Sequence, residues 1–267
     1  MPRHRVRTAT RPRVAISEYT IDPASAAAAG ADNDDITIRG ARVGDVLVAF
    51  APSALIANVQ PFVTRVGTAD QMRIRMHNPT AGAVDAASQT WVVANLRGLP
   101  LSEVTIDPAS VAADVCPSQN VTVVGLRVGD IILAIPPAAI LADVTVQALR
   151  VSVADTLPLR YANGSAGAVD AAAQTWVLAN LRGFPMTEFT IDPASVAANV
   201  APAQTVTIAG LRVGDVVLAV PPQALIADVA FVPLRVSVAD ALPHRAFNPT
   251  LAAVNAAAQT WVIVKLT

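Results

Sequence analysis

Three copies of the sequence TIDPAS, each with an aspartate and a serine three residues apart, are the first candidates for a chemical site. They occupy residues 20–25, 105–110 and 190–195. The aspartates could serve as acids or metal ligands, but no second carboxylate recurs at metal-like spacing in the same loop. Each aspartate precedes a proline, which suits the cap of a helical turn or a type I turn. We therefore interpret TIDPAS as a bend that the chain makes three times.

The sequence RVGD also occurs three times, at residues 42–45, 127–130 and 212–215. A lone Gly-Asp lacks the run of glycines and the lysine of a phosphate-binding loop. Between two strands, however, glycine supplies a positive φ and aspartate tolerates turn geometry. These residues are interpreted as a turn that joins two strands.

Histidine and cysteine are too scarce to build a recurring catalytic centre. His4, His77 and His244 occupy non-equivalent places, and Cys116 is the single cysteine, interpreted as a bystander in a loop. No Ser-His-carboxylate set and no zinc spacing recurs. Residues 31–35 (ADNDD) lack the glycine and closing glutamate of a calcium loop, so we expect a solvated loop. The sequence thus predicts a protein that is not an enzyme and has no cofactor or metal.

Other residues recur once per copy. Cross-strand pairing on a solvated face would explain the recurrent charged residues without any functional site. They could instead line an interface with a partner protein. The recurrent tryptophans could stack on a sugar or base, but a core position on the last strand is favoured. The charges are Glu18, Glu103, Glu188, Arg65, Arg150, Arg235, Arg75, Arg160 and Arg245, and the tryptophans are Trp91, Trp176 and Trp261.

All these motifs repeat with an unbroken period of 85 residues. Such a unit is too long for a solenoid repeat and long enough for a small domain. The sequences LRGLP and LRGFP mark the boundaries between copies. We therefore expect a basic N-terminal arm at residues 1–13, followed by domains at residues 14–98, 99–183 and 184–267.

Within each copy the pattern is that of short strands. The second copy predicts strands at residues 101–106, 121–126, 131–135, 143–152, 156–163 and 175–181. Glycine, proline, asparagine or aspartate separates most of them, which is typical of an antiparallel sandwich or small barrel. The predicted fold is all-β: three tandem antiparallel β-sandwich or barrel domains, jelly-roll-like or Ig-like.

Composition limits the partners. Hydrophobic residues make up 53% of the chain and aromatic residues only 4%, yet no apolar run approaches the ~20 residues needed to span a bilayer. The arm carries five arginines and no acidic residue, whereas the rest of the chain is acidic. Two interpretations of this arm stay open: a disordered polar tail, or a segment that docks on an acidic protein surface through Arg3, Arg5, Arg7, Arg11 and Arg13. Binding to nucleic acid or to a membrane is not expected.

The repeated unit resembles a small β-module of tailed-phage virion structural proteins. The resemblance rests on the TIDPAS strand and its Ala-rich loop, the GLRVGD turn, the PP stop, the VSVAD turn, the NPT stretch and the closing strand of the third copy. It covers nearly the whole chain except the arm, and its motifs are turn residues, which imply a shared fold. Such modules typically decorate heads or form fibres and spikes.

Two roles are compatible with these features. The first is a capsid decoration or cement protein on the head of the virion, bound to the major capsid protein or another virion protein, with possible self-association. In that role the three copies could fill a quasi-three-fold position that a homotrimer fills elsewhere. The alternative is a receptor- or glycan-binding fibre or spike module, which the near absence of aromatic residues from the loops disfavours.

Overall fold

The structure is a computed structural model that describes residues 14–27, 30–52, 60–63, 66–78, 82–97, 99–137, 144–163, 165, 167–222, 229–255 and 257–267. Within these ranges the chain forms eighteen β-strands and no helix, which confirms the all-β prediction. Accordingly, no helix in the described ranges is long and apolar enough to cross a membrane.

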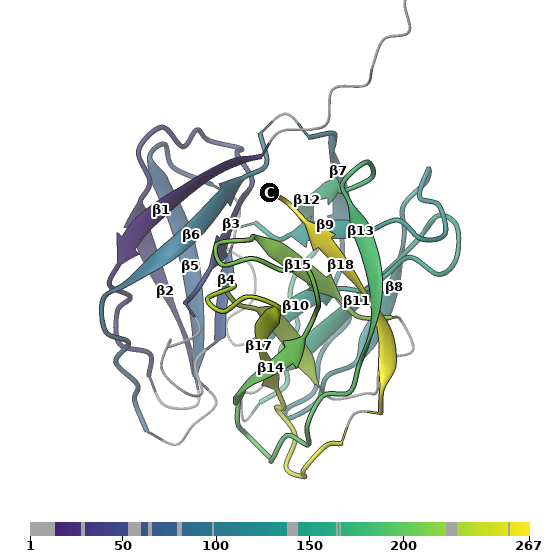
Figure 1. Cartoon of the computed structure of the whole chain (residues 1–267). Helices are drawn as coiled ribbons and strands as arrows, with labels where there is room; N and C mark the ends of the chain where they lie inside the picture. The colour runs from purple at the N-terminus through teal and green to yellow at the C-terminus, as the bar shows by residue number, and fades with distance from the viewer. Residues whose placement is uncertain are drawn as a thin grey trace, which may run out of the picture.

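The first repeat forms two three-stranded antiparallel sheets, on the left of Figure 1. One sheet has the order β1-β6-β3 and the other the order β2-β5-β4, so the first and last strands of the repeat pair with each other. The strands are β1 (Ala15–Ile21), β2 (Gly30–Thr37), β3 (Leu47–Phe50), β4 (Gln60–Val63), β5 (Gln71–Asn78) and β6 (Gln89–Asn95).

The second and third repeats have the same topology. Their sheets have the orders β7-β12-β9 and β10-β11-β8, then β13-β18-β15 and β14-β17-β16. The second repeat contains β7 (Leu101–Ile106), β8 (Ser118–Thr122), β9 (Ile132–Ile135), β10 (Val144–Ala148), β11 (Thr156–Asn163) and β12 (Gln174–Asn180). The third contains β13 (Met186–Ile191), β14 (Ala203–Thr207), β15 (Val217–Val220), β16 (Ala230–Pro233), β17 (Ala241–Phe247) and β18 (Gln259–Lys265).

The RVGD turn lies between two strands, β8 and β9, as predicted, but these strands belong to different sheets. The strand expected at residues 121–126 instead spans Ser118–Thr122. Gly125 and Gly129 both have positive φ, 95° and 90°, and the chain between them crosses from the sheet of β8 to the sheet of β9. Positive φ at these positions favours glycine because it lacks a Cβ atom.

Each repeat has a core between its own two sheets. Trp91, Trp176 and Trp261 are at most 2% exposed, which confirms their core position. In the second repeat Trp176 and Leu178 of β12 pack with Leu159 of β11. Burial of such large apolar side chains is the main favourable contribution to folding.

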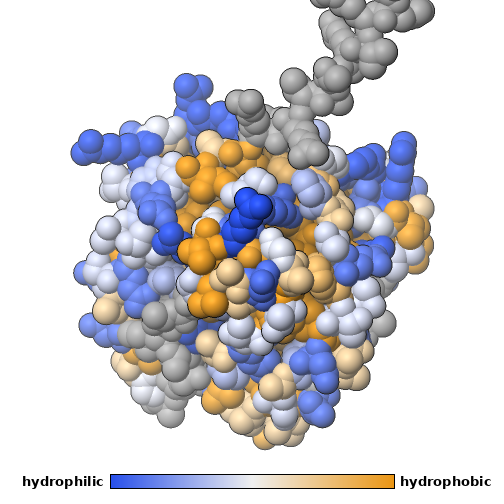
Figure 2. All heavy atoms as spheres, in the orientation of Figure 1, coloured by the Kyte–Doolittle hydropathy of each residue, from blue (hydrophilic) through white to orange (hydrophobic). Residues whose placement is uncertain are grey.

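A further core is shared by all three repeats. Side chains on the opposite face of each last strand, such as Val92, Val177 and Val262, belong to one cluster of buried residues. The central strands β6, β12 and β18 are therefore covered on both faces, by their own second sheet and by the other repeats. On the face shown in Figure 2, much of the apolar surface lies toward the middle and the hydrophilic side chains lie mainly around the edge.

The contacts between repeats follow a cyclic pattern. Arg150 of the second repeat forms an ion pair with Glu188 of the third at 2.6 Å, and its backbone N–H donates to Pro221 O at 3.2 Å. The residue 85 positions later, Arg235, pairs with Glu18 of the first repeat, and its N–H donates to Ala51 O at 2.8 Å.

The third repeat therefore contacts the first as the second contacts the third. Together with the core that all three repeats share, these two contacts arrange the repeats as a ring around a pseudo-three-fold axis. The equivalent residue of the first repeat, Arg65, lies outside the described residues. The ion pairs correct the prediction that these charges pair across strands, because they join different repeats.

Candidate functional site

A cavity of about 180 Å³ lies where the three repeats meet. Its walls include Phe50, Ile135 and Val220, which occupy equivalent positions at the ends of β3, β9 and β15. The lining is largely apolar, with Arg75 as its charged residue. Thr145 also lines it, and the hydroxyl of Thr145 has no hydrogen-bond partner among the described residues. The three repeats thus surround a common axis.

Three equivalent arginines are buried rather than solvated. Arg75, Arg160 and Arg245 are 7%, 3% and 1% exposed, so the prediction of a solvated face is wrong for them. Arg160 Nη1 donates across the repeat boundary to Val229 O at 3.2 Å, and Arg245 Nη1 donates to Ala201 O at 2.9 Å. Burial lowers the pKa of Arg245 to about 10. Arg160 and Arg245 therefore satisfy main-chain carbonyls.

Two histidines are buried in the same region of the ring. His77 of the first repeat lies 4.7 Å from Phe247 of the third, measured between ring centroids. Burial lowers the pKa of His77 to about 4, helped by the charge of Arg75, and burial lowers that of His244 to about 4. Both imidazoles are therefore neutral at pH 7. Because His77 is wholly buried, it packs the contact between repeats and is inaccessible to a substrate.

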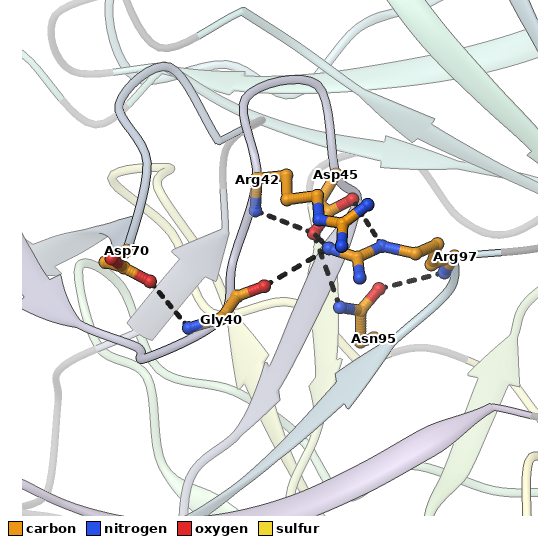
Figure 3. Close-up of polar contacts among 6 residues, drawn as sticks. All are labelled: Gly40, Arg42, Asp45, Asp70, Asn95 and Arg97. Atoms are coloured by element: carbon orange, nitrogen blue, oxygen red, sulfur yellow. Dashed lines mark hydrogen bonds and ion pairs between the residues drawn. The ribbon is translucent and has the colours of Figure 1, made fainter.

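The three RVGD aspartates each hold a cation of their own repeat. Asp45 Oδ1 accepts from Arg97 Nε at 3.0 Å, and Asp45 Oδ2 accepts the backbone N–H of Arg42 at 2.9 Å (Figure 3). Asp130 accepts from Arg182 in the same way. These ion pairs tie each turn to the segment that leaves the last strand of the repeat.

The third repeat keeps this ion pair with different residues. Thr267 occupies the position of Arg97 and Arg182. Lys265, two residues earlier, supplies the cation instead, with its Nζ 2.7 Å from Asp215 Oδ2. Burial alone raises the pKa of Asp215, but the hydrogen bond from Lys265 and the N–H of Arg212 leave it below its usual value. The retained pairing indicates that the aspartate needs a cation.

We expect Asp130→Asn to lower the free energy of unfolding by about 1–2 kcal/mol, because the charged hydrogen bonds of a buried carboxylate are lost. Urea unfolding measures this change. The exposed Asp170 provides the control, since Asp170→Asn should change stability by less than about 0.5 kcal/mol. Equal unfolding midpoints for Asp130→Asn and the wild type would contradict the structural role of the pair.

TIDPAS is a connection between sheets. Asp22 is exposed, and the Ser25 hydroxyl donates to Val84 O at 3.4 Å. The backbone N–H of Ala24 donates to Asp34 Oδ2. In the later repeats glutamines take the role of this aspartate, with Ala109 bonded to Gln119 and Ala194 bonded to Gln204. The segment forms neither the helical turn nor the turn expected from its Asp-Pro sequence, because its N–H groups bond to a neighbouring strand.

Three equivalent asparagines fasten the loop that follows TIDPAS. Asn163 begins the sequence NGS, a formal glycosylation signal, but it is fully buried. Its Nδ2 donates to the carbonyls of Val111, Ala112 and Gly167 at 2.9–3.0 Å. Asn78 and Asn248 make the equivalent bonds. An amide held in this way is not available for modification.

The remaining predicted features lie as follows. Residues 31–35 belong to strand β2, so the prediction of a loop is wrong. Asp35 pairs there with Arg73 at 2.7 Å, and Asn33 accepts from Arg75. Cys116 lies in a loop, as predicted, but it is buried against residues of the third repeat. The arm residues Arg3, Arg5, Arg7, Arg11 and Arg13 lie outside the described residues.

The sequence matches no protein-family model, and no curated protein or solved structure matches it either. Among the described residues no group of three or more His, Cys, Asp or Glu side chains could hold a metal ion.

Proposed function

We propose that the protein is a non-enzymatic structural protein of a tailed-phage particle that decorates or cements the head. In this proposal one chain occupies a three-fold position of the capsid lattice, where a homotrimer of single modules would otherwise bind. The observation that supports it most is the cyclic contact pattern, in which Arg150–Glu188 and Arg235–Glu18 are the same contact one repeat apart. A three-fold assembly is matched to a three-fold site because each repeat can make the same contact.

The hydrogen bonds of the residues that recur in all three copies are compatible with a structural role. The aspartates, asparagines and arginines that recur in the three copies hold turns, loops and buried carbonyls of the fold. Covalent connection of three modules raises the effective concentration of the second and third contacts once the first has formed. A cement protein needs this combination of stable β-structure and multiple weak contacts.

Binding to purified heads tests the proposal. Undecorated heads of the phage that encodes the chain are mixed with the fluorescently labelled protein, and bound protein is counted after sedimentation. We expect saturation at one chain per three-fold position. Host cells serve as the second arm of the experiment. Binding to cells without binding to heads would contradict the proposal and support the receptor-binding alternative.

Deletion of residues 1–13 tests the arm. We expect the shortened chain to bind heads at least about tenfold more weakly, because five arginine contacts are lost even though each exposed pair contributes little. The difference should shrink at high salt because ions screen exposed charges. Urea unfolding of the shortened chain verifies that it is folded before its binding is compared. Unchanged head binding by a folded, shortened chain would exclude the docking role of the arm.

A further inference from the structure

The three RVGD turns lie at one end of the ring, the end at which the described chain begins. β1 begins there, because Ala15 pairs with Asn95 at the end of β6, and Asn95 and Arg97 bind Asp45. Ala15 is two residues from the arm. We call this surface the arm end of the ring.

The later repeats have the same orientation. The chain leaves β6 after Asn95 and enters β7 at Leu101, which pairs with Ala179 near the end of β12. Leu96, Leu181 and Leu266, which follow the last strands of the three repeats, belong to the shared core. The three RVGD turns therefore surround the pseudo-three-fold axis at the arm end.

The fold explains two of the four residues that are identical in all three turns. The glycines have φ values of 87–90°, which side chains disfavour. The aspartates form the ion pairs described above. Both residue types are required by the backbone and by the attachment of the turn to its repeat.

The fold does not explain the other two residues. The valines project into solvent with exposed fractions of 66%, 68% and 64%, and they belong to no buried cluster: Val43, Val128 and Val213. The arginines are also exposed, and their side chains form no hydrogen bond or ion pair with another described residue: Arg42, Arg127 and Arg212. Only their backbone N–H groups are used, and any residue except proline has one.

A neighbouring turn provides a comparison, because one of its exposed positions differs among the three copies. Asp70, Asp155 and Asp240 all have positive φ and accept the backbone N–H of a glycine at 2.5–2.6 Å. Two residues before each aspartate, however, the first repeat has Thr68 where the others have Val153 and Val238. The exposed position varies in that turn, whereas the exposed Arg-Val pair of RVGD does not.

We propose that the three Arg-Val pairs form a docking face for an acidic protein surface that itself repeats with three-fold symmetry. Each valine inserts into an apolar site of the partner, and each arginine pairs with a carboxylate beside that site. The arm is joined to the chain at this end, before Val14, and its sequence carries five arginines. This inference rests on the proposed function and specifies which end of the ring contacts the capsid protein.

Substitution of the turn valines tests this docking face. In the full chain, Val43→Asp, Val128→Asp and Val213→Asp place a carboxylate in solvent, so the fold is retained, as a thermal unfolding curve verifies. Each single substitution removes a valine that is buried only in the complex and introduces a charge that the acidic partner repels, so it should weaken binding to undecorated heads about tenfold. The triple variant should lose at least about 100-fold, because the three contacts act together.

The matched control is Leu251→Asp. Leu251 is 75% exposed. It lies in the loop that follows the last residue of β17 and contains Asn248, and this loop is at the end of the ring opposite the RVGD turns. We expect its binding to equal that of the wild type. If the wild type binds heads and the triple variant binds within about twofold of it, the docking face is wrong while the proposed function stands. If the wild type does not bind heads, the proposed function itself is wrong.

Discussion

Val177→Asp should unfold all three repeats, although it changes only the second. Val177 is 2% exposed and packs in the core that the three repeats share. An unpaired carboxylate in such a place costs several kcal/mol, and we expect a loss of more than about 4 kcal/mol. A typical domain has a total stability of about 5–15 kcal/mol. Because Val92 and Val262 line the same core, the damage extends to the other repeats.

Tryptophan fluorescence during urea unfolding measures this effect repeat by repeat. Trp91, Trp176 and Trp261 report on one repeat each, and variants that keep a single tryptophan separate the signals. Val128→Asp is the control, because Val128 is 68% exposed and a surface substitution should change stability by less than about 0.5 kcal/mol. If Val177→Asp unfolds the second repeat and leaves the first and third unchanged, the repeats fold as separate domains and the shared core is wrong.

Acidification should destabilise the ring between pH 6.5 and pH 4. The pKa values of His77 and His244 fall from 6.5 to about 4 on folding, chiefly through burial. A proton therefore binds the unfolded chain more tightly than the folded one. The resulting stability is fully present above pH 6.5, and it is lost as the pH falls toward the folded pKa. The loss amounts to about 3 kcal/mol per histidine at its limit.

The RVGD aspartates respond at lower pH. Their pKa values in the folded chain lie below the ordinary 3.8. Their contribution is therefore present above about pH 3.8 and is lost as the pH falls through the folded values. The two effects consequently occupy different pH ranges.

The chain supplies the matched substitutions for the histidines. Ala162 occupies the position of His77 in the second repeat, and Leu159 occupies that of His244. We expect the double variant His77→Ala, His244→Leu to lose most of the decline in urea midpoint between pH 7 and pH 4.5. A packing defect would shift all midpoints equally and leave the decline unchanged. A double variant with the pH dependence of the wild type would contradict the assignment.

Local sequence was sufficient to predict the strands whose boundaries carry turn residues. The predicted ranges 101–106 and 156–163 coincide with β7 and β11, because an Asp-Pro pair ends the first and an aspartate with positive φ precedes the second. Local sequence also predicted the RVGD turn between β8 and β9, but not that these two strands lie in different sheets. Glycine and aspartate determine the local φ, but long-range packing determines which sheet the next strand joins.

The ring could not be predicted from the motifs of a single copy, although the closing strand contains a signal for it. In QTWVLAN both Trp176 and Val177 are apolar, and a strand that is apolar on both faces must be covered on both. The mean hydropathy of +0.48 without a membrane-spanning run has the same implication. The burial of the three arginines could not be predicted from the sequence, because an arginine in a strand usually faces water.

The aspartate–arginine ion pairs could not be predicted from the local sequence either. Asp45 and Arg97 lie 52 residues apart, so no spacing rule connects them. A comparison of the copies could have suggested the pair, because the third copy loses the arginine at Thr267 and gains Lys265. Internal repeats thus provide a limited substitute for a set of related sequences.

Electron microscopy of heads saturated with the protein tests the central claim most directly. We predict one chain at each occupied three-fold position, seen as three lobes around the axis with the arm end toward the capsid. Three chains around one axis, or protein found only on the tail, would contradict the claim that a single chain fills a three-fold site.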